Sequence, residues 1–168
     1  MTISMYQVSV PVFSSMLKGL AHVLSKGEAH AAETGIDPAS LVSARLIADM
    51  HPFSRQIQIA TDHAKGAPAR LAGTTPPRFE DDETTFAELR TRIEKTREYL
   101  KGLRAADIDG SEEKPILLKL GQREMTFTGQ QYLLNFAMPN FYFHVTTAYA
   151  ILRGKGVPLG KSDFFGGR

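Results

Sequence analysis

Apolar residues recur at intervals of three and four along the first half of the chain, the spacing that gives an α-helix one buried face. Residues 4–34 follow this pattern and predict a long first helix with Pro11 near its start. Residues 53–71 follow it again and predict a second helix, with Pro52 in a first turn whose amide protons need no partner. The connection between them, residues 36–49, contains the sequence DPAS, which is typical of a cap followed by a short helical turn.

A third helix is expected to start at Thr85, because Thr85 and Glu88 have the spacing of a capping box and residues 86–103 again have one apolar face. An acidic run, residues 80–83, lies just before this start. Carboxylates are stabilised beside the positive end of a helix, so we interpret the run as a favourable charge placement rather than a catalytic carboxylate pair.

Two short apolar runs, residues 116–120 and 124–127, flank Gly121-Gln122 and predict a β-hairpin. Two strands alone are marginally stable, so the hairpin is expected to lie against the helices. A fourth helix is predicted from Thr128 or Gly129 to Arg153, with a kink at Pro139. The expected fold is therefore all-α, a four-helix bundle with a small β-hairpin before the last helix.

Composition favours one domain. The chain has 168 residues without a long change in composition, so residues 1–168 are expected to share a single core, with residues 154–168 as a glycine-rich tail packed on the bundle. No run approaches the roughly 18 apolar residues of a membrane span, and the opening MTISMYQ lacks the features of a signal peptide. We expect a soluble, cytoplasmic protein that does not bind membranes.

The charge and the chemistry-bearing residue types narrow the function further. The formal net charge of +2 comes from scattered basic residues, which argues against a nucleic-acid partner. The chain has no cysteine, so any metal site must use His, Asp, Glu or Asn. The tail contains GKS, but a phosphate-binding loop needs a glycine where Lys155 stands, five positions before Gly160. No serine lies in a GxSxG turn, and no catalytic residue is assigned.

The last predicted helix carries the candidate site. At about 100° per residue, one stripe contains both apolar and polar side chains: Leu133, Phe136, Ala137, Asn140, His144, Thr147 and Ile151. Asn140 and His144 are one turn apart on this stripe, a geometry with which helices hold a metal ion. Asp49 would point into the bundle if the second helix extended back one turn, whereas His51 is the better ligand by its chemistry.

Two interpretations of these four residues stay open. Asp49 or His51 could join Asn140 and His144 to bind a divalent ion, zinc or nickel. A hydrogen-bonded network without an ion would equally satisfy inward polar groups. The remaining histidines are expected to have other roles. His22 and His30 are expected to be solvated, and His63 to be partly buried and hydrogen-bonded on the second helix.

Several segments resemble a bacterial family known as domain of unknown function 1993: SMYQVSVPVF, LIADMHPF, QIQIATDHAKGAPARLAG, FTGQQYLLNFAMPNFYFHVTTAYAILR and GVPLGKSDFFGG. The family is grouped with the DinB-like and YfiT-like bundles, which implies an up-down-down-up four-helix bundle, often a dimer. Members of the wider group bind a divalent metal through one histidine of the second helix and an H-x-x-x-H pair on the last, and several are thiol-dependent transferases or isomerases.

Only part of the family's set of metal-binding histidines is found at the matching positions of this chain. The later histidine of the pair matches His144, the earlier one falls on Asn140, and the second-helix position falls near Asp49 to His51. If His144 is taken as the first of the pair, the second falls on Ala148, which cannot bind an ion. The full three-histidine set is therefore absent.

Three functional hypotheses follow. The first is a DinB-like divalent-metal-dependent enzyme with a degenerate metal site. The second is a metal-free, stress-related or small-molecule-binding bundle in which His144 borders an apolar pocket. The third is a structural role for the polar residues. For the outer face of the last helix we predict a homodimer, or else cover from the hairpin or tail; this face contains Tyr142, Val145, Tyr149 and Leu152.

Overall fold

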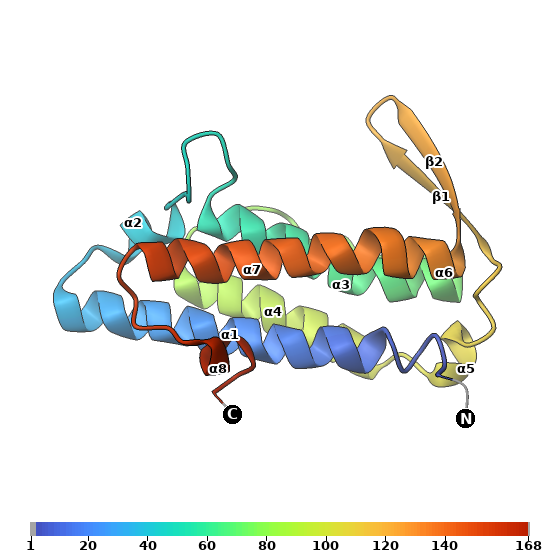
Figure 1. Cartoon of the computed structure of the whole chain (residues 1–168), viewed down its shortest axis with the longest axis horizontal. Helices are drawn as coiled ribbons and strands as arrows, with labels where there is room; N and C mark the ends of the chain where they lie inside the picture. The colour runs from blue at the N-terminus through green and yellow to red at the C-terminus, as the bar shows by residue number, and fades with distance from the viewer. Residues whose placement is uncertain (1–2, 168) are drawn as a thin grey trace.

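The computed structural model describes residues 3–167, and only the backbone of Leu120. Four long helices lie side by side as a bundle (Figure 1): α1 (Val10–Thr34), α3 (Phe53–Ala72), α4 (Phe86–Lys101) and α7 (Met138–Gly154). The loop of residues 73–85 returns the chain along the bundle, so α3 and α4 run in the same direction and α1 and α7 run in the opposite one. The expected up-down-down-up bundle is confirmed.

The first helix begins later than the periodicity predicts, at Val10 rather than near Ser4. The preceding residues form turns, in which the Val8 amide donates to the Ser4 carbonyl at 3.1 Å. Pro11 is the second residue of α1, where its missing amide proton costs no helical hydrogen bond. The proline thus marks the start of the helix more accurately than the apolar spacing does.

Local capping signals are confirmed where the sequence contains them. Asp37 accepts a hydrogen bond from the Ala39 amide at 3.0 Å and caps the short helix α2 (Pro38–Val42). At the start of α4 the Thr85 hydroxyl accepts from the Glu88 amide at 3.2 Å, and the Glu88 carboxylate accepts from the Thr85 amide at 2.9 Å. The reciprocal pair satisfies two amides that would otherwise have no helical partner.

The hairpin pairs β1 (Pro115–Leu120) with β2 (Arg123–Thr128) in antiparallel register, after the short helix α5 (Ala105–Ile108). Gly121 opens the turn with a φ of 62°, a conformation that favours glycine. Only part of the hairpin lies against the helices as predicted. Ile116 and Leu118 are buried, whereas the strands rise away from one end of the bundle towards an exposed turn (Figure 1).

The last helical stretch consists of α6 (Gly129–Tyr132), a π-helical turn η1 (Leu133–Ala137) and α7, without a break between them. The Met138 amide donates to the Leu133 carbonyl, five residues back, which defines the wider turn. Pro139 follows immediately and has no amide proton to continue the α-helical pattern. A kink was predicted at Pro139, and what the structure has is one π turn just before this residue.

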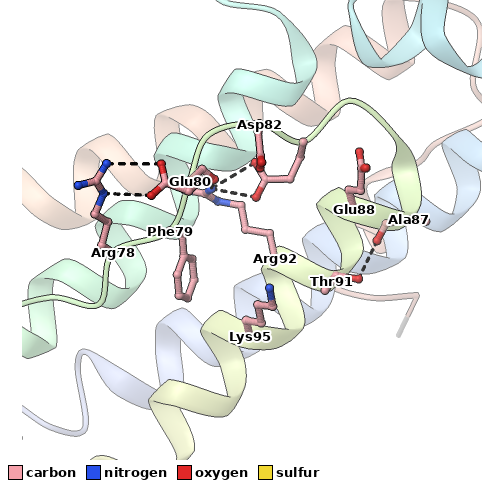
Figure 2. A pocket seen from close by; sticks show the side chains of 10 residues that line it. Arg78, Phe79, Glu80, Asp82, Ala87, Glu88, Thr91, Arg92 and Lys95 are labelled. Atoms are coloured by element: carbon pink, nitrogen blue, oxygen red, sulfur yellow. Dashed lines mark hydrogen bonds and ion pairs between the residues drawn. The ribbon is translucent and has the colours of Figure 1, made fainter.

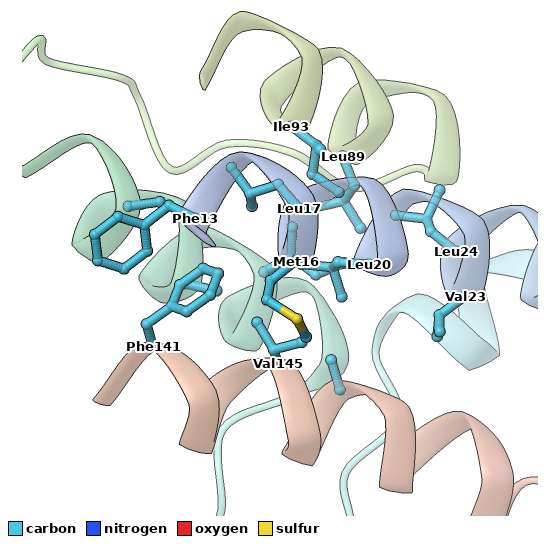
Figure 3. Close-up of a cluster of buried hydrophobic side chains, with 14 of the residues drawn as sticks. Phe13, Met16, Leu17, Leu20, Val23, Leu24, Leu89, Ile93, Phe141 and Val145 are labelled. Carbon is cyan, nitrogen blue, oxygen red and sulfur yellow. The ribbon is translucent and has the colours of Figure 1, made fainter. Parts of the chain in front are cut away.

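The inner face of α7 is rotated from the predicted stripe (Figure 3). Phe141 and Val145 point towards α1, and the Phe141 ring packs edge-on against Phe13 with centroids 4.9 Å apart. Val145 and Leu152, which were assigned to an outer dimer face, are buried inside the monomer. Asn140 lies at the edge of the core and is half-buried. Ala137, Thr147 and Ile151 of the predicted stripe are buried, so part of the inner face was predicted correctly. An almost uniformly apolar helix gives little directional signal for the rest.

The chain after α7 packs on the bundle. Val157 and Leu159 are buried in the main core, and α8 (Lys161–Phe164) lies against α1 (Figure 1). The Phe164 ring packs edge-on against Tyr149 at 6.0 Å, so the tail covers part of the face that was assigned to a dimer. Within residues 3–167, no helix combines the length and apolarity that a membrane span requires.

His22 was expected to be solvated, but its side chain is only 36% exposed and has a partner in the tail. His22 Nε2 and Lys26 Nζ contact the Asp163 carboxylate at 2.9 and 3.2 Å and fasten the tail to α1. The backbone amide of Gly160, with His22 and Lys26, lowers the pKa of Asp163 to about 2. Asp163 is 141 residues from His22 in sequence, so no local pattern could have indicated the pair.

Candidate functional site

A cavity of about 380 Å³ lies between α3 and the last helical stretch, with the hairpin at one end. It contains two of the predicted site residues, Asn140 and His144. The lining combines apolar, aromatic and polar side chains: Ile59, Asp62, His63 and Arg70 from α3, Leu118 from β1, and Tyr132, Phe136, Asn140 and His144 from α6, η1 and α7. Small-molecule sites in proteins commonly have this size and this mixture of residues.

The π turn places four lining residues on one wall. Tyr132, Phe136, Asn140 and His144 follow one another at intervals of four. In an uninterrupted α-helix, twelve residues would rotate His144 about 120° away from Tyr132. A π turn rotates less per residue than an α turn, so η1 reduces this angle and keeps both ends of the wall beside α3.

His144 is oriented by Gln56, a buried residue of α3 that no sequence motif connects with the site. The Gln56 Nε2 amide donates to the His51 carbonyl at 3.0 Å, which turns Gln56 Oε1 towards His144 Nδ1 at 2.7 Å. An amide oxygen can only accept, so His144 Nδ1 carries the proton. The lone pair is then on Nε2, which is available to accept a hydrogen bond or bind a metal ion.

His63 and His144 form a pair of neutral rings. Their centroids are 6.2 Å apart and their planes differ by 15°. Burial lowers the pKa of His63 to about 4, partly offset by the nearby Asp62 carboxylate. Burial also lowers the pKa of His144 to about 4, with smaller contributions from His63 and His51. Both imidazoles are therefore uncharged at neutral pH. His63 is half-buried as expected, but within residues 3–167 its ring has no hydrogen-bond partner.

Arg70 supplies a positive charge at the other end of the cavity. Its Nη1 donates to the Tyr132 hydroxyl at 3.1 Å, and its guanidinium lies 6.0 Å from the centroid of the Tyr132 ring. Burial raises the pKa of Tyr132, so the phenol stays neutral. Arg70 could not be predicted as a site residue from the sequence, because one arginine at the flank of an amphipathic helix carries no motif.

Asp62 links the cavity to a buried ion network centred on Arg92 of α4. The Arg92 guanidinium pairs with Asp62 at 2.9 Å, Asp81 at 3.0 Å and Glu83 at 3.0 Å. Its Nε also donates to the Thr61 hydroxyl at 2.7 Å. The acidic run was interpreted as a charge placement at the start of α4. Two of its members instead hold the loop of residues 73–85 to the buried arginine, an arrangement that needs tertiary contact to be seen.

A larger hollow of about 520 Å³ lies where this loop meets α4 (Figure 2). In Figure 2, the Arg92 side chain extends from α4 to the part of this loop that carries Glu80. Four charged groups of this hollow already form pairs, because Arg78 pairs with Glu80 at 3.2 Å and Arg92 pairs with Glu83 at 3.0 Å. None of the predicted site residues lines it. The smaller cavity beside His144 is therefore the better candidate site.

The structure brings together only part of the predicted metal set. Asp49 and His51 precede α3, which begins at Phe53, and both are exposed, so the expectation that Asp49 points into the bundle is wrong. His51 is near enough to lower the pKa of His144 slightly. Asn140 Nδ2 donates to the Phe136 carbonyl at 2.7 Å, one turn back on the same helical stretch. In the described part of the chain, no three His, Asp or Glu side chains converge as metal ligands. The residues as placed do not fit a metal centre built from three such side chains.

The architecture is that of a DinB-like four-helix bundle, and comparison with known proteins agrees. A crystal structure of a DinB family member protein from Shewanella denitrificans superposes with a TM-score of 0.86 and is 41% identical, covering 96% of this chain and 91% of that one. Residues 5–165 match the family described as domain of unknown function (DUF1993), and the chain belongs to this family. No curated protein matches the chain.

Proposed function

We propose that the protein binds a small organic molecule in the cavity beside His144, without requiring a metal ion. The observation that carries the proposal is the fixed orientation of His144, whose protonated Nδ1 is held by Gln56 Oε1 at 2.7 Å. This bond leaves Nε2 as a hydrogen-bond acceptor on a cavity wall that also carries Tyr132, Phe136 and Asn140. A polar group with a fixed position in such a cavity fixes the orientation in which a ligand binds.

The proposal is tested by filling the cavity. Leu118→Trp places a larger side chain in the lining of the cavity. The control, Leu117→Trp, alters the preceding residue, which is 54% exposed and points to the other face of the hairpin. Protein dialysed against EDTA is screened for binding by ligand-observed NMR with a library of small aromatic acids, alcohols and amides. We expect hits for the wild type and Leu117→Trp, and their loss in Leu118→Trp. Ligands that bind Leu118→Trp and His144→Phe as tightly as the wild type would contradict the proposal.

A divalent metal ion, with or without enzymatic activity, is the second candidate. It is favoured by the Nδ1–H bond from His144 to Gln56, because metal-bound histidines usually donate their other ring proton in this way. The other metal ligands at this site would be His51 and the side-chain oxygen of Asn140. Elemental analysis after reconstitution with zinc or nickel at neutral pH tests it, with His144→Ala as comparison. Less than one ion per chain in the wild type, or equal content in the variant, would exclude this site.

A further inference from the structure

We propose that Arg70 is the anchor for a carboxylate in this cavity, so that the ligand is a small organic acid with a planar apolar body. The inference rests on the proposed function and specifies its ligand class. It depends on the charge balance of the cavity, on the space that the chain leaves for the guanidinium, and on the groups between Arg70 and His144.

The charge of Arg70 is not neutralised by the protein. Within residues 3–167 no carboxylate lies at ion-pair distance from its guanidinium, and the Tyr132 hydroxyl is its hydrogen-bond acceptor. Asp62, the acidic residue of the lining, is already paired with Lys65 at 2.6 Å and Arg92 at 2.9 Å. The cavity therefore has an excess positive charge at Arg70. A carboxylate would match the two-pronged geometry of a guanidinium that has donors to spare.

The helix leaves room for this guanidinium. Gly66 lies one turn before Arg70 on α3 and is buried, and a methyl group there would be 2.5 Å from Arg70 Nη1. Glycine inside a helix costs about 1 kcal/mol relative to alanine. A side chain at position 66 would displace the guanidinium from its present place beside Tyr132. The glycine thus sets the position of the charge.

The rest of the lining defines the remainder of the ligand. Tyr132 and Phe136 are stacked with centroids 6.0 Å apart, and Phe136 is also 5.9 Å from His63, which gives a continuous aromatic wall. The neutral His144 Nε2 accepts a hydrogen bond at the other end of the cavity. An acid that carries a hydroxyl or amino group on its apolar body would use both ends.

The closing experiment compares acids with their uncharged amides. Isothermal titration at neutral pH measures binding of benzoate, 4-hydroxybenzoate, benzamide and 4-hydroxybenzamide to the wild type, Arg70→Gln and Arg153→Gln. Arg153 is exposed near the end of α7 and does not line the cavity. In the wild type and Arg153→Gln each acid is expected to bind at least about tenfold more tightly than its amide. In Arg70→Gln this preference is expected to disappear.

Gly66→Ala provides a variant in which loss of binding cannot be ascribed to unfolding. The new methyl group displaces the flexible end of Arg70, while alanine favours the helix. We expect unchanged or higher thermal stability together with at least about fivefold weaker binding of the acids. Amide binding is expected to change less, because the amides do not depend on the charge.

The outcomes separate the two proposals. If acids and amides bind equally, or if Arg70→Gln keeps the preference for acids, the carboxylate anchor is excluded while small-molecule binding stands. If none of the four compounds binds and the broader NMR screen also finds no ligand, both the proposed function and the proposed role of Arg70 are wrong. If the screen finds only neutral ligands, the anchor alone is overturned.

Discussion

Arg92 keeps a full positive charge at 2% exposure, and this is possible because the chain surrounds it with acceptors. Asp62, Asp81 and Glu83 pair with its guanidinium, and its Nε–H donates a hydrogen bond to the Thr61 hydroxyl. A buried charge that loses its partner is far more costly than an exposed one. The same residue therefore fixes a long loop and orients Asp62 at the candidate cavity.

Arg92→Met is expected to lower the free energy of unfolding by about 3 kcal/mol or more, because it leaves partly buried carboxylates without their cation. Arg90→Met in the same helix is the matched control. Arg90 pairs with Glu28 at the surface, and its loss is expected to cost less than about 1 kcal/mol. Urea unfolding followed by circular dichroism measures both. Equal losses in the two variants would show that the network around Arg92 adds nothing beyond a surface pair.

The two cavity histidines predict a pH dependence of stability. Their rings take up protons near pH 6.5 when unfolded but only near pH 4 when folded, because burial disfavours the charged form. Between these values the unfolded chain binds more protons, so the free energy of unfolding falls as the pH falls from 6.5 to 4. Above pH 6.5 both rings are neutral in both states and contribute no slope.

His63→Gln is expected to flatten this fall by an amount on the order of 1 kcal/mol, once solvent screening at a half-buried ring is allowed for. Urea midpoints at pH about 7, 5.5 and 4.5 measure the effect. His30→Gln, on α1 and outside the cavity, serves as the control for the loss of a histidine elsewhere in the chain. An identical slope in His63→Gln and the wild type would show that this ring titrates normally in the folded chain.

At the scale of elements, the sequence predicted what is decided locally. The capping box at Thr85 and the turn at Gly121 depend on side chains within a few residues, and both are confirmed. The inner face of α7 was predicted only in part, because its apolar residues surround the helix and Val145 and Leu152 were assigned to the outside. The π turn before Pro139 also shifts the phase of every residue that precedes it. Periodicity alone cannot show which side of such a helix faces the core.

The contact between α1 and α8 gives a prediction about the tail. Gly19→Ala would place a methyl group 2.2 Å from the Phe164 carbonyl oxygen, so α8 must move. We expect a loss of about 1–3 kcal/mol and faster amide exchange across residues 157–167. Gly154→Ala is the control, since a methyl group there meets no atom within 4 Å. Unchanged exchange in Gly19→Ala would mean that the tail does not depend on this close approach.

At the scale of the whole molecule, the sequence placed Asn140 and His144 on the last helix and proposed two partners near the start of α3. It could not identify Gln56 or Arg70 as members of the site. Gln56 contacts His144 across 88 residues of sequence, and Arg70 meets Tyr132 across 62. Such pairs arise from the packing of α3 against the last helical stretch. Family resemblance predicted the bundle well because the fold depends on many residues, whereas the site depends on a few.

A homodimer stays a prediction, but its proposed face is largely used within one chain. Val145 and Leu152 are buried, and Tyr142 packs against Phe141 with ring centroids 5.6 Å apart. We therefore expect sedimentation equilibrium at micromolar concentration to give the same oligomeric state for the wild type and Tyr142→Ser. Conversion of a dimer to a monomer by Tyr142→Ser would show that the dimer interface lies on this face of α7.

The π turn makes the last helical stretch one residue too long for the distance it spans. Removing a single residue from Leu133–Ala137 would restore a regular α-helix without shortening the bundle appreciably. Eleven residues would then separate Tyr132 from His144, and eleven residues of α-helix rotate only about 20° beyond three full turns. Tyr132 would therefore stay beside Arg70, and His144 would stay beside Gln56. The π turn absorbs one additional residue while the two ends of the cavity keep their places.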